Sequence, residues 1–210
     1  MKEYYPQAIK SIVEFVKVGG HRWPTYKKYD RYLELGIYKP EGAQERYSHL
    51  YRFNFEFIAP LFSESYAVDI DPTCYDHIKH IKGSKWFNML TDDFIANEMP
   101  QIGKVDVVFI DADHSFDQSF KDFIGMAPYV APEGLVFLHD TYPPIYSEKS
   151  FRMCSDTWRT AEKIRDDDNL RKDWEIITLP GWLGLSVLKK IHRPTLQSHR
   201  DALKKRQKSP

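Results

Sequence analysis

The chain has 210 residues, of which 42% are hydrophobic and 29% charged, so it can bury one sizeable core and is not a disordered protein. Its formal net charge is zero, but the charge is unevenly distributed. From Lys189 onward there are eight Lys or Arg and one Asp, so this end carries +7 and the first 188 residues carry −7. This distribution argues against a nucleic-acid binder with a basic folded body, and it predicts a basic, disordered tail over 191–210.

Cysteine usage and hydropathy both indicate a cytoplasmic protein. Cys74 and Cys154 are widely spaced, so we expect two free thiols in a reducing compartment and neither a disulfide framework nor a thiolate zinc site. Residues 1–17 lack the uncharged apolar core of a signal peptide, and no stretch approaches the length of a membrane span. We therefore expect one domain over 1–190, without membrane contact.

The predicted elements alternate between helix and strand along the chain. Apolar residues at helical spacing predict an N-terminal helix within 1–20 that ends at a pair of glycines. Further helices are expected over 42–62, after the Asp71-Pro72 cap, over 115–130 and near 154–168, and buried strands over 31–36, 65–71, 84–90, 105–113 and 133–140. Apolar runs at 174–180 and 183–190 predict a closing hairpin. The fold class is thus α/β, a doubly wound and mostly parallel sheet with a C-terminal antiparallel hairpin.

Polar residues follow the predicted strands at their carboxyl ends, where open α/β sheets bind ligands. Gly36 would let the backbone approach a ligand closely, and Asp69 could accept both hydroxyls of a ribose. Taken singly, a turn glycine and a solvated acid explain them equally well, but together they favour a nucleoside. Thr91 and Asp92 could bond an adenine amino group, or could instead form an ST-turn or helix cap.

Two acids and two histidines follow the fourth and fifth predicted strands. Asp111 and Asp140 should end adjacent strands, so their carboxylates could hold Mg²⁺ or another divalent ion between them, or could cap loop N–H groups. His114 lies three residues after Asp111 and could act as a general base, although a packing or capping role is the alternative. His139 ranks below His114, because a regular pleat would turn it to the side of the strand opposite Asp140.

The order of LELGIY, AVDIDP, MLTDDF, VDVVFIDADHSF and APEGLVFLHDTYPP, ending in WLGLSVLKK, resembles the class I S-adenosylmethionine-dependent methyltransferases. The resemblance is strongest to the small-molecule and sugar O-methyltransferase branch known as methyltransferase family 24, and it covers about 30–190. FIDADH and FLHDT are its most specific parts. It implies a seven-stranded Rossmann-like methyltransferase sheet and transfer of a methyl group from S-adenosylmethionine to a hydroxyl of a small molecule or sugar.

The resemblance also implies roles for individual residues. Glu34 and Gly36 would border the methionine part of the cofactor, Asp69 the ribose, and Thr91 with Asp92 the adenine. Asp111 would contact the cofactor, bind the metal and take part in catalysis. Asp140 would be the second metal ligand and His114 the catalytic base. The remaining cofactor contacts implied are Ile37, Tyr38 and Ile70.

Two departures from the family pattern stand out. The loop after the first strand reads GIYKPEGAQ, where the family has closely spaced glycines, and His139 and Thr141 flank Asp140 where metal-binding relatives offer a further acid or amide. A non-catalytic nucleoside-binding module of the same fold therefore remains an alternative. Only the basic tail supports a nucleic-acid methyltransferase. A dinucleotide-dependent dehydrogenase is disfavoured because the sequence lacks the G-x-G-x-x-G motif after the first strand. A homo-oligomer is compatible with the sequence. Tyr38, Tyr142 and Trp182 could line an acceptor pocket or simply pack.

Overall fold

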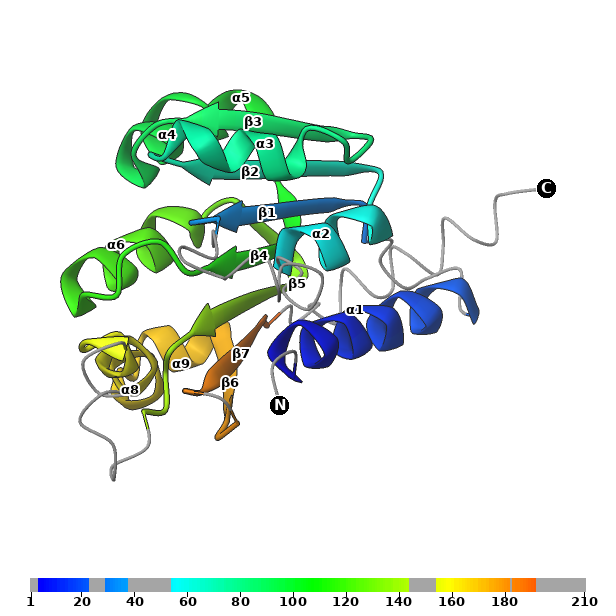
Figure 1. Cartoon of the computed structure of the whole chain (residues 1–210). Helices are drawn as coiled ribbons and strands as arrows, with labels where there is room; N and C mark the ends of the chain where they lie inside the picture. The colour runs from blue at the N-terminus through cyan, green and yellow to red at the C-terminus, as the bar shows by residue number, and fades with distance from the viewer. Residues whose placement is uncertain (1–3, 23–28, 38–53, 144–153, 182, 192–210) are drawn as a thin grey trace.

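A computed structural model describes residues 4–22, 29–37, 54–143, 154–181 and 183–191, and shows a central sheet covered by helices on both faces (Figure 1). The strands are β1 (Arg31–Leu35), β2 (Glu64–Asp69), β3 (Ser84–Asn88), β4 (Val105–Ile110), β5 (Val130–His139), β6 (Trp174–Leu179) and β7 (Leu185–Lys190). The longer helices are α1 (Tyr4–Arg22), α4 (Thr91–Asn97), α6 (Phe116–Met126) and α8 (Trp158–Asp166). Shorter helices are α2 (Asn54–Ile58), η2 (Ala59–Leu61), η3 (Pro72–Cys74), α3 (Tyr75–Ile78), α5 (Met99–Ile102) and α9 (Leu170–Asp173).

The seven strands form one sheet in the order β3-β2-β1-β4-β5-β7-β6. β1 to β5 pair in parallel, whereas β7 runs antiparallel to both β5 and β6. The predicted fold class is confirmed, including the C-terminal hairpin. The order reverses between β1 and β4, and this switch point is where doubly wound sheets bind their ligands.

Alternating strand residues divide the core into two layers, as the two-residue period of a strand requires. On one face, Tyr32 and Phe109 pack with Ile9 and Val13 of α1 and with Phe55 of α2. On the other, residues of the same strands pack against α4, α5, α6 and α8, and this layer includes Leu33, Val108, Phe94, Phe123 and Ile164. Strands buried on both faces explain the nearly continuous apolar runs in the sequence.

Most predicted elements are present, with some differences at their ends. Asp71 caps η3 as expected, since its carboxylate accepts a hydrogen bond from the N–H of Thr73 at 2.8 Å. The helix expected over 42–62 is described only from residue 54, where α2 and η2 occupy 54–61. α4 and α5, which were not predicted, fill the crossover between β3 and β4. None of the described helices combines the length and hydropathy needed to cross a membrane. Of the tail predicted over 191–210, residues 192–210 lie outside the described residues, as do Tyr38 and Trp182.

Candidate functional site

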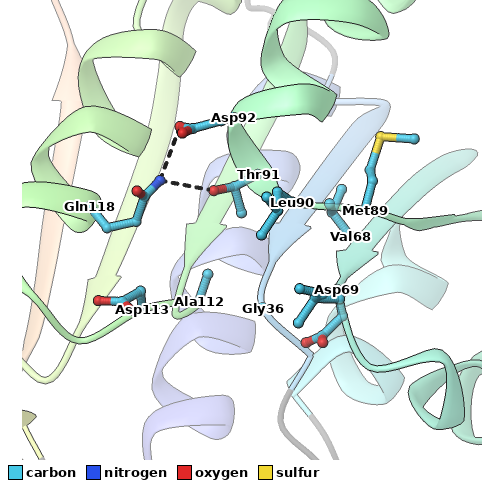
Figure 2. Close-up of a pocket in the computed structure, with 11 residues that line it drawn as sticks. Gly36, Val68, Asp69, Met89, Leu90, Thr91, Asp92, Ala112, Asp113 and Gln118 are labelled. Atoms are coloured by element: carbon cyan, nitrogen blue, oxygen red, sulfur yellow. Dashed lines mark hydrogen bonds between the residues drawn. The ribbon is translucent and has the colours of Figure 1, made fainter.

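A cavity of about 390 Å³ lies at the carboxyl ends of β1, β2 and β4, next to the first turns of α4 and α6 (Figure 2). Parallel strands end on the same edge of the sheet, so their following loops converge there. Five residues predicted to contact a cofactor line it: Gly36, Asp69, Ile70, Thr91 and Asp92. The other lining residues are Val68, Met89, Leu90, Ala112, Asp113 and Gln118. The predicted nucleoside-binding residues are thus brought together around one hollow.

Gly36 occupies a position that only glycine fits. Its φ is +83°, and a Cβ built there would lie 2.4 Å from both the carbonyl oxygen of Asp111 and the Cα of Ala112. Any larger residue would therefore push the tip of β1 away from the tip of β4. The glycine serves this close approach of two strand ends, and it also lines the cavity.

Asp69 joins the loops that follow β1 and β2. Its Oδ2 accepts a hydrogen bond from the N–H of Ile37 at 2.7 Å, and its Oδ1 accepts one from the N–H of Asp71 at 2.7 Å. Each carboxylate oxygen can accept more than one hydrogen bond, so ligand hydroxyls can still be bound. Asp69 therefore both orders the rim of the cavity and presents an acceptor to it.

The cavity wall formed by α4 and α6 is held by Gln118, which the sequence reasoning did not single out. Its amide nitrogen donates to Thr91 Oγ1 and Asp92 Oδ1 at 3.1 Å each (Figure 2). The same nitrogen also lies 2.9 Å from Asp122 Oδ1, to which it donates. The alternative role of Thr91 as a helix cap is not observed, because the N-cap of α4 is Leu90 and makes no side-chain cap. Asp122 lies behind this wall, and its burial raises its pKa to about 6.

Glu34 and Ile37 are not among the residues that line the cavity. Glu34 is buried and accepts hydrogen bonds from the hydroxyl of Tyr32 and, at 2.9 Å, from the amide of Asn54. Burial raises the pKa of Glu34 to about 8, opposed by these bonds and reinforced by the charges of Asp111 and Asp69. Its direct contact with a cofactor stays a prediction.

A charged cluster adjoins the cavity at the ends of β4 and β5. It consists of Asp111, His139 and Asp140, each of which offers one ligand atom, and these atoms lie within 4.8 Å of one another. His139 Nδ1 is 3.1 Å from Asp111 Oδ1 and 3.3 Å from Asp140 Oδ1. The predicted pair of acids does meet at adjacent strand ends, and a histidine is their neighbour.

The cluster is buried, so its charges interact strongly. Burial works against charge on His139, but the negative charge and hydrogen bond of Asp111 outweigh it and raise the pKa of the imidazole. Burial raises the pKa of Asp140, as does the charge of Asp111, while the two histidines lower it. For Asp111, the histidines outweigh burial and hold its pKa below the usual value.

The predicted orientation of His139 is wrong. A regular pleat would place it on the side of the strand opposite Asp140, but Asp140 adopts the left-handed conformation with φ +56°. This departure breaks the alternation at the end of β5 and brings both side chains into one cluster. The sequence hint was the HD pair itself, but the backbone turn needed to interpret it is not visible in the residue pattern.

His114 borders the open side of the cluster. Its side chain is 38% exposed, with Nε2 at 3.4 Å from Asp111 Oδ1 and Nδ1 at 3.1 Å from Asp140 Oδ2. It can therefore reach solvent and the two acids together, as a proton-accepting group must. The predicted catalytic pair of His114 and Asp111 is adjacent in space, and the role of each remains a prediction.

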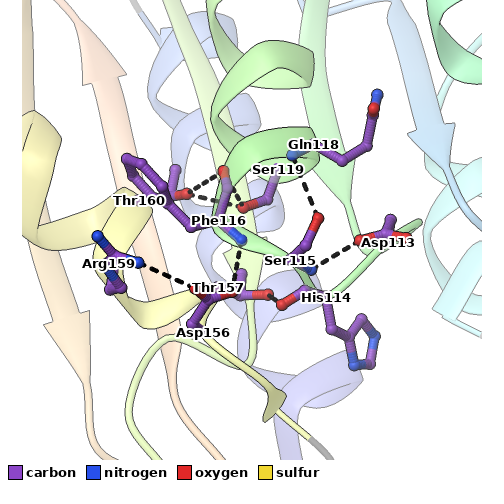
Figure 3. A network of polar contacts seen from close by, with 10 residues as sticks. All are labelled: Asp113, His114, Ser115, Phe116, Gln118, Ser119, Asp156, Thr157, Arg159 and Thr160. Atoms are coloured by element: carbon purple, nitrogen blue, oxygen red, sulfur yellow. Dashed lines mark hydrogen bonds and ion pairs between the residues drawn. The ribbon is translucent and has the colours of Figure 1, made fainter.

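A polar network fixes the backbone on either side of His114 (Figure 3). The carbonyl of His114 accepts hydrogen bonds from Thr157 Oγ1 at 2.7 Å and from the N–H of Asp156 at 3.2 Å. Asp156 Oδ1 in turn accepts from the N–H of Phe116 at 2.7 Å, and Ser115 caps α6 by accepting from the N–H of Gln118 at 3.3 Å. The segment preceding α8 therefore positions the imidazole over the acids.

The acidic residues at the strand ends divide between two neighbouring sites. Asp69 lines the cavity, whereas the side chain of Asp111 belongs to the charged cluster, although the next two residues, Ala112 and Asp113, line the cavity. Gly36, which lines the cavity, packs closely against the backbone of Asp111 and Ala112. The two sites adjoin through the short segment 111–114.

Comparisons with known proteins agree with this arrangement. A family model described as a methyltransferase domain matches residues 45–141. No curated protein sequence matches the chain. A putative caffeoyl-CoA O-methyltransferase from Staphylococcus aureus has a similar structure, with 16% identity, a TM-score of 0.61, and coverage of 90% of this chain and 84% of that one.

Two further solved structures share the fold at low identity. The SAH-bound methyltransferase PaMTH1 from Podospora anserina has 12% identity and a TM-score of 0.53, covering 90% of this chain and 83% of that one. MycE methyltransferase from the mycinamycin biosynthetic pathway, in complex with Mg, SAH and mycinamycin VI, has 16% identity and a TM-score of 0.52. The match covers 83% of this chain and 49% of MycE, so the chain spans about half of that protein. Residues 45–141 thus match a methyltransferase-domain model and the chain shares the fold of these solved methyltransferases, which agrees with the resemblance to the class I methyltransferases of family 24.

Proposed function

We propose that this chain transfers a methyl group from S-adenosylmethionine to a hydroxyl of a small molecule or sugar. One observation carries the proposal: the cavity that contains Gly36 and Asp69 adjoins a buried acid–histidine cluster whose open side is bordered by His114. A cofactor site beside a proton acceptor is what hydroxyl methylation requires. The methyltransferase neighbours support the same reaction class.

The lining of the cavity suits an adenosine-bearing ligand. Asp69 offers a carboxylate to ribose hydroxyls, and the exposed apolar side chains of Ile70 and Leu90, 66% and 53% accessible, stand at the cavity and can cover a flat base. Thr91 and Asp92 place polar groups at the edge that such a base would present. This mixture of apolar walls and a few polar groups is typical of small-molecule sites.

Chemistry divides between the two sites. When bound, S-adenosylmethionine would supply an electrophilic methyl carbon, with S-adenosylhomocysteine as the leaving group, and a divalent ion held by Asp111 and Asp140 would polarise the acceptor hydroxyl. His114 then accepts the hydroxyl proton, and Asp140, 3.1 Å from its Nδ1, stabilises the resulting imidazolium. The other residues of the cluster hold these groups in place.

The site residues fit a divalent ion, since the carboxylates of Asp111 and Asp140 meet there and the buried Asp140 Oδ1, 3.3 Å from His139 Nδ1, accepts no well-directed hydrogen bond from the described residues. A cation would satisfy this oxygen and offset the charge of the two acids. We further propose a cytoplasmic location, a small-molecule acceptor rather than nucleic acid, and one domain over 1–190. A homo-oligomeric assembly is compatible with these assignments.

Calorimetric titration with S-adenosylhomocysteine, the product form of the cofactor, tests the proposal first. We expect saturable one-to-one binding, and the absence of heat at millimolar ligand would overturn it. The bound protein is then supplied with S-adenosylmethionine and a panel of catechols, other phenols and sugars, and release of S-adenosylhomocysteine is measured. Binding without release from any acceptor would instead favour the non-catalytic nucleoside-binding alternative.

A further inference from the structure

His114 lies in the loop between β4 and α6, and this loop has no helix or strand of its own. Within the loop, Asp113 Oδ1 accepts a hydrogen bond from the N–H of Ser115 at 2.7 Å. A loop is less rigid than the strands and helices it connects, so its position depends on the contacts that it makes. A misplacement of about 1 Å in a reacting group can cost about 100-fold in rate. The contacts that hold this loop therefore bear directly on catalysis.

The segment 154–157, which precedes α8, holds the loop at two points (Figure 3). The carbonyl oxygen of His114 accepts hydrogen bonds from Thr157 Oγ1 at 2.7 Å and from the N–H of Asp156 at 3.2 Å. Two residues later, the N–H of Phe116 in the first turn of α6 has no partner within its own helix and donates to Asp156 Oδ1 at 2.7 Å. The backbone is thus held at His114 itself and at the start of α6.

These two contacts are themselves well supported. Thr157 is only 5% exposed, and a buried hydroxyl that loses its hydrogen-bond partner is costly, so the bond to His114 has little competition from water. Arg159 Nη1 lies 3.1 Å from Asp156 Oδ2, and its guanidinium stands 4.6 Å from the ring centroid of Phe116. The carboxylate of Asp156 is therefore kept in the orientation that reaches the N–H of Phe116.

The same segment also contacts the acid that faces His114. The thiol of the fully buried Cys154 donates a hydrogen bond to the carboxylate of Asp140. Asp140 Oδ2 in turn lies 3.1 Å from His114 Nδ1. Asp140 follows β5, whereas His114 follows β4, so the two side chains belong to different elements of the fold. One short segment therefore contacts the base through Thr157 and the acid through Cys154.

We infer that Thr157 and Cys154 are positioning residues, which set the distance between His114 and Asp140 from the α8 side and thereby the rate of turnover. The inference rests on the proposed function in one respect, because it takes His114 as the base. Neither positioning residue lines the cavity, so cofactor affinity should not depend on either of them. The position of the imidazole can be measured without any methyl acceptor. Failure of the proposed function, seen as no turnover by the unaltered protein, is therefore distinguishable from failure of the inference.

The first test is kinetic and uses the full chain with an acceptor identified in the panel. Thr157→Val keeps the shape of the side chain but removes its hydroxyl, so kcat should fall at least about 10-fold. Affinity for S-adenosylhomocysteine, measured by calorimetry, should stay within about 2-fold of the unaltered protein. Thr157→Ser restores the donor and should return kcat to within about 3-fold of the unaltered value. Unchanged kcat in Thr157→Val would overturn the inference.

Thr160→Val is the matched control for a general loss of structure. Thr160 is fully buried in α8, and its hydroxyl lies 2.7 Å from Ser119 Oγ and 3.5 Å from the carbonyl oxygen of Phe116. The control removes a comparable hydroxyl from the same contact between α6 and α8, but leaves the bonds to His114 in place. Both variants should lower the melting temperature, whereas only Thr157→Val should lower kcat. An equal fall in kcat for both would indicate a purely structural role and overturn the inference.

Nuclear magnetic resonance on the full chain with isotope-labelled histidine tests the position of the imidazole without turnover. The ring signals of His114 are assigned by their absence in His114→Ala. In Thr157→Val these signals should shift or broaden, because the ring moves relative to the acids, whereas in Thr160→Val they should stay in place. The signals of His80, a 59% exposed surface histidine, should not move in either variant. His114 signals that are the same in Thr157→Val as in the unaltered protein would overturn the inference.

A second pair of variants keeps the inference testable if Thr157→Val fails to fold. Cys154→Ala removes the contact with Asp140, so the ring signals of His114 should again shift and kcat should fall about 3- to 10-fold. Cys154→Ser retains a donor and should restore both. Unmoved His114 signals in Cys154→Ala would show that the segment does not set the distance between base and acid, and would overturn the inference.

Discussion

The cavity and the charged cluster are neighbours on one sheet edge, but they are built in opposite ways. The cavity is open, and its polar groups bond mainly to each other and to backbone N–H groups, as Asp69 and Gln118 show. The cluster is nearly closed, and its acids and imidazoles lie 3.1 to 3.4 Å apart with few neutral partners. The first arrangement suits recognition of a neutral, flat ligand, and the second suits handling of protons and cations.

This difference teaches that position at a strand end alone does not define a residue's role. Asp69 ends β2 and Asp111 follows β4, so both lie on the same edge of the sheet. Backbone N–H donors contact Asp69, however, whereas histidines contact Asp111. If the division is correct, substitutions in the cluster should change catalysis or metal binding, and substitutions in the cavity should change cofactor affinity.

The largest effect is expected for His114→Ala. Removal of the general base should lower turnover about 100- to 10,000-fold, with affinity for S-adenosylhomocysteine within about 2-fold of the unaltered protein. Turnover is measured with an acceptor identified in the panel, and cofactor affinity by calorimetry. His80→Ala is the matched control. A parallel loss of cofactor affinity would show that the cluster and the cavity are not functionally separate.

Asp69→Asn should have the complementary effect. Loss of the carboxylate charge weakens hydrogen bonds to ribose hydroxyls, each worth about 1.5–3 kcal/mol, so affinity for S-adenosylhomocysteine should fall about 10- to 100-fold. The amide also places a donor near the N–H of Ile37 or Asp71, which loosens the rim of the cavity. Calorimetry is the measurement, with the exposed Asp76→Asn as control. Unchanged affinity would remove Asp69 from the cofactor site.

Much of the fold could be predicted because its signals are local. Runs such as VDVVFI are buried on both faces, and the Asp71-Pro72 pair is a helix start whose capping bond is confirmed in the structure. Cofactor-lining positions such as Gly36 and Asp69 could be identified from the rule that loops converge at the carboxyl ends of parallel strands.

The rest of the site depends on features that a residue pattern does not encode. His139 joins the cluster because a single residue, Asp140, leaves the extended conformation. Gln118 reaches Thr91 from a helix 27 positions further along the chain, so only the packing of α6 against α4 reveals it. The side chain of Asp111 contacts the two histidines, whereas its backbone packs against Gly36, which lines the cavity.

The smallest expected effect is on the pH dependence of stability, and it concerns the buried Asp122 behind Gln118 in the cavity wall. Its folded-state pKa of about 6 exceeds the ordinary value of 3.8, because burial disfavours the charged form. The folded state therefore holds the proton more tightly than the unfolded state, and stability from this group is fully present below pH 3.8 and lost as pH rises to about 6. The loss is about 1.4 kcal/mol per pH unit, or about 3 kcal/mol in all.

Asp122→Asn removes this titration, so relative to the unaltered protein the variant should gain about 3 kcal/mol of unfolding free energy between pH 4 and pH 7. Urea unfolding at several pH values measures the difference between the two proteins. For Asp92→Asn, the unfolding free energy relative to the unaltered protein should instead fall as pH rises. A hydrogen bond from Lys121 lowers the pKa of Asp92, so the stabilisation that the variant lacks grows with pH. If the difference in unfolding free energy between Asp122→Asn and the unaltered protein did not change with pH, the acid would be solvated in the folded protein. The cavity wall would then be more open than the cluster beside it.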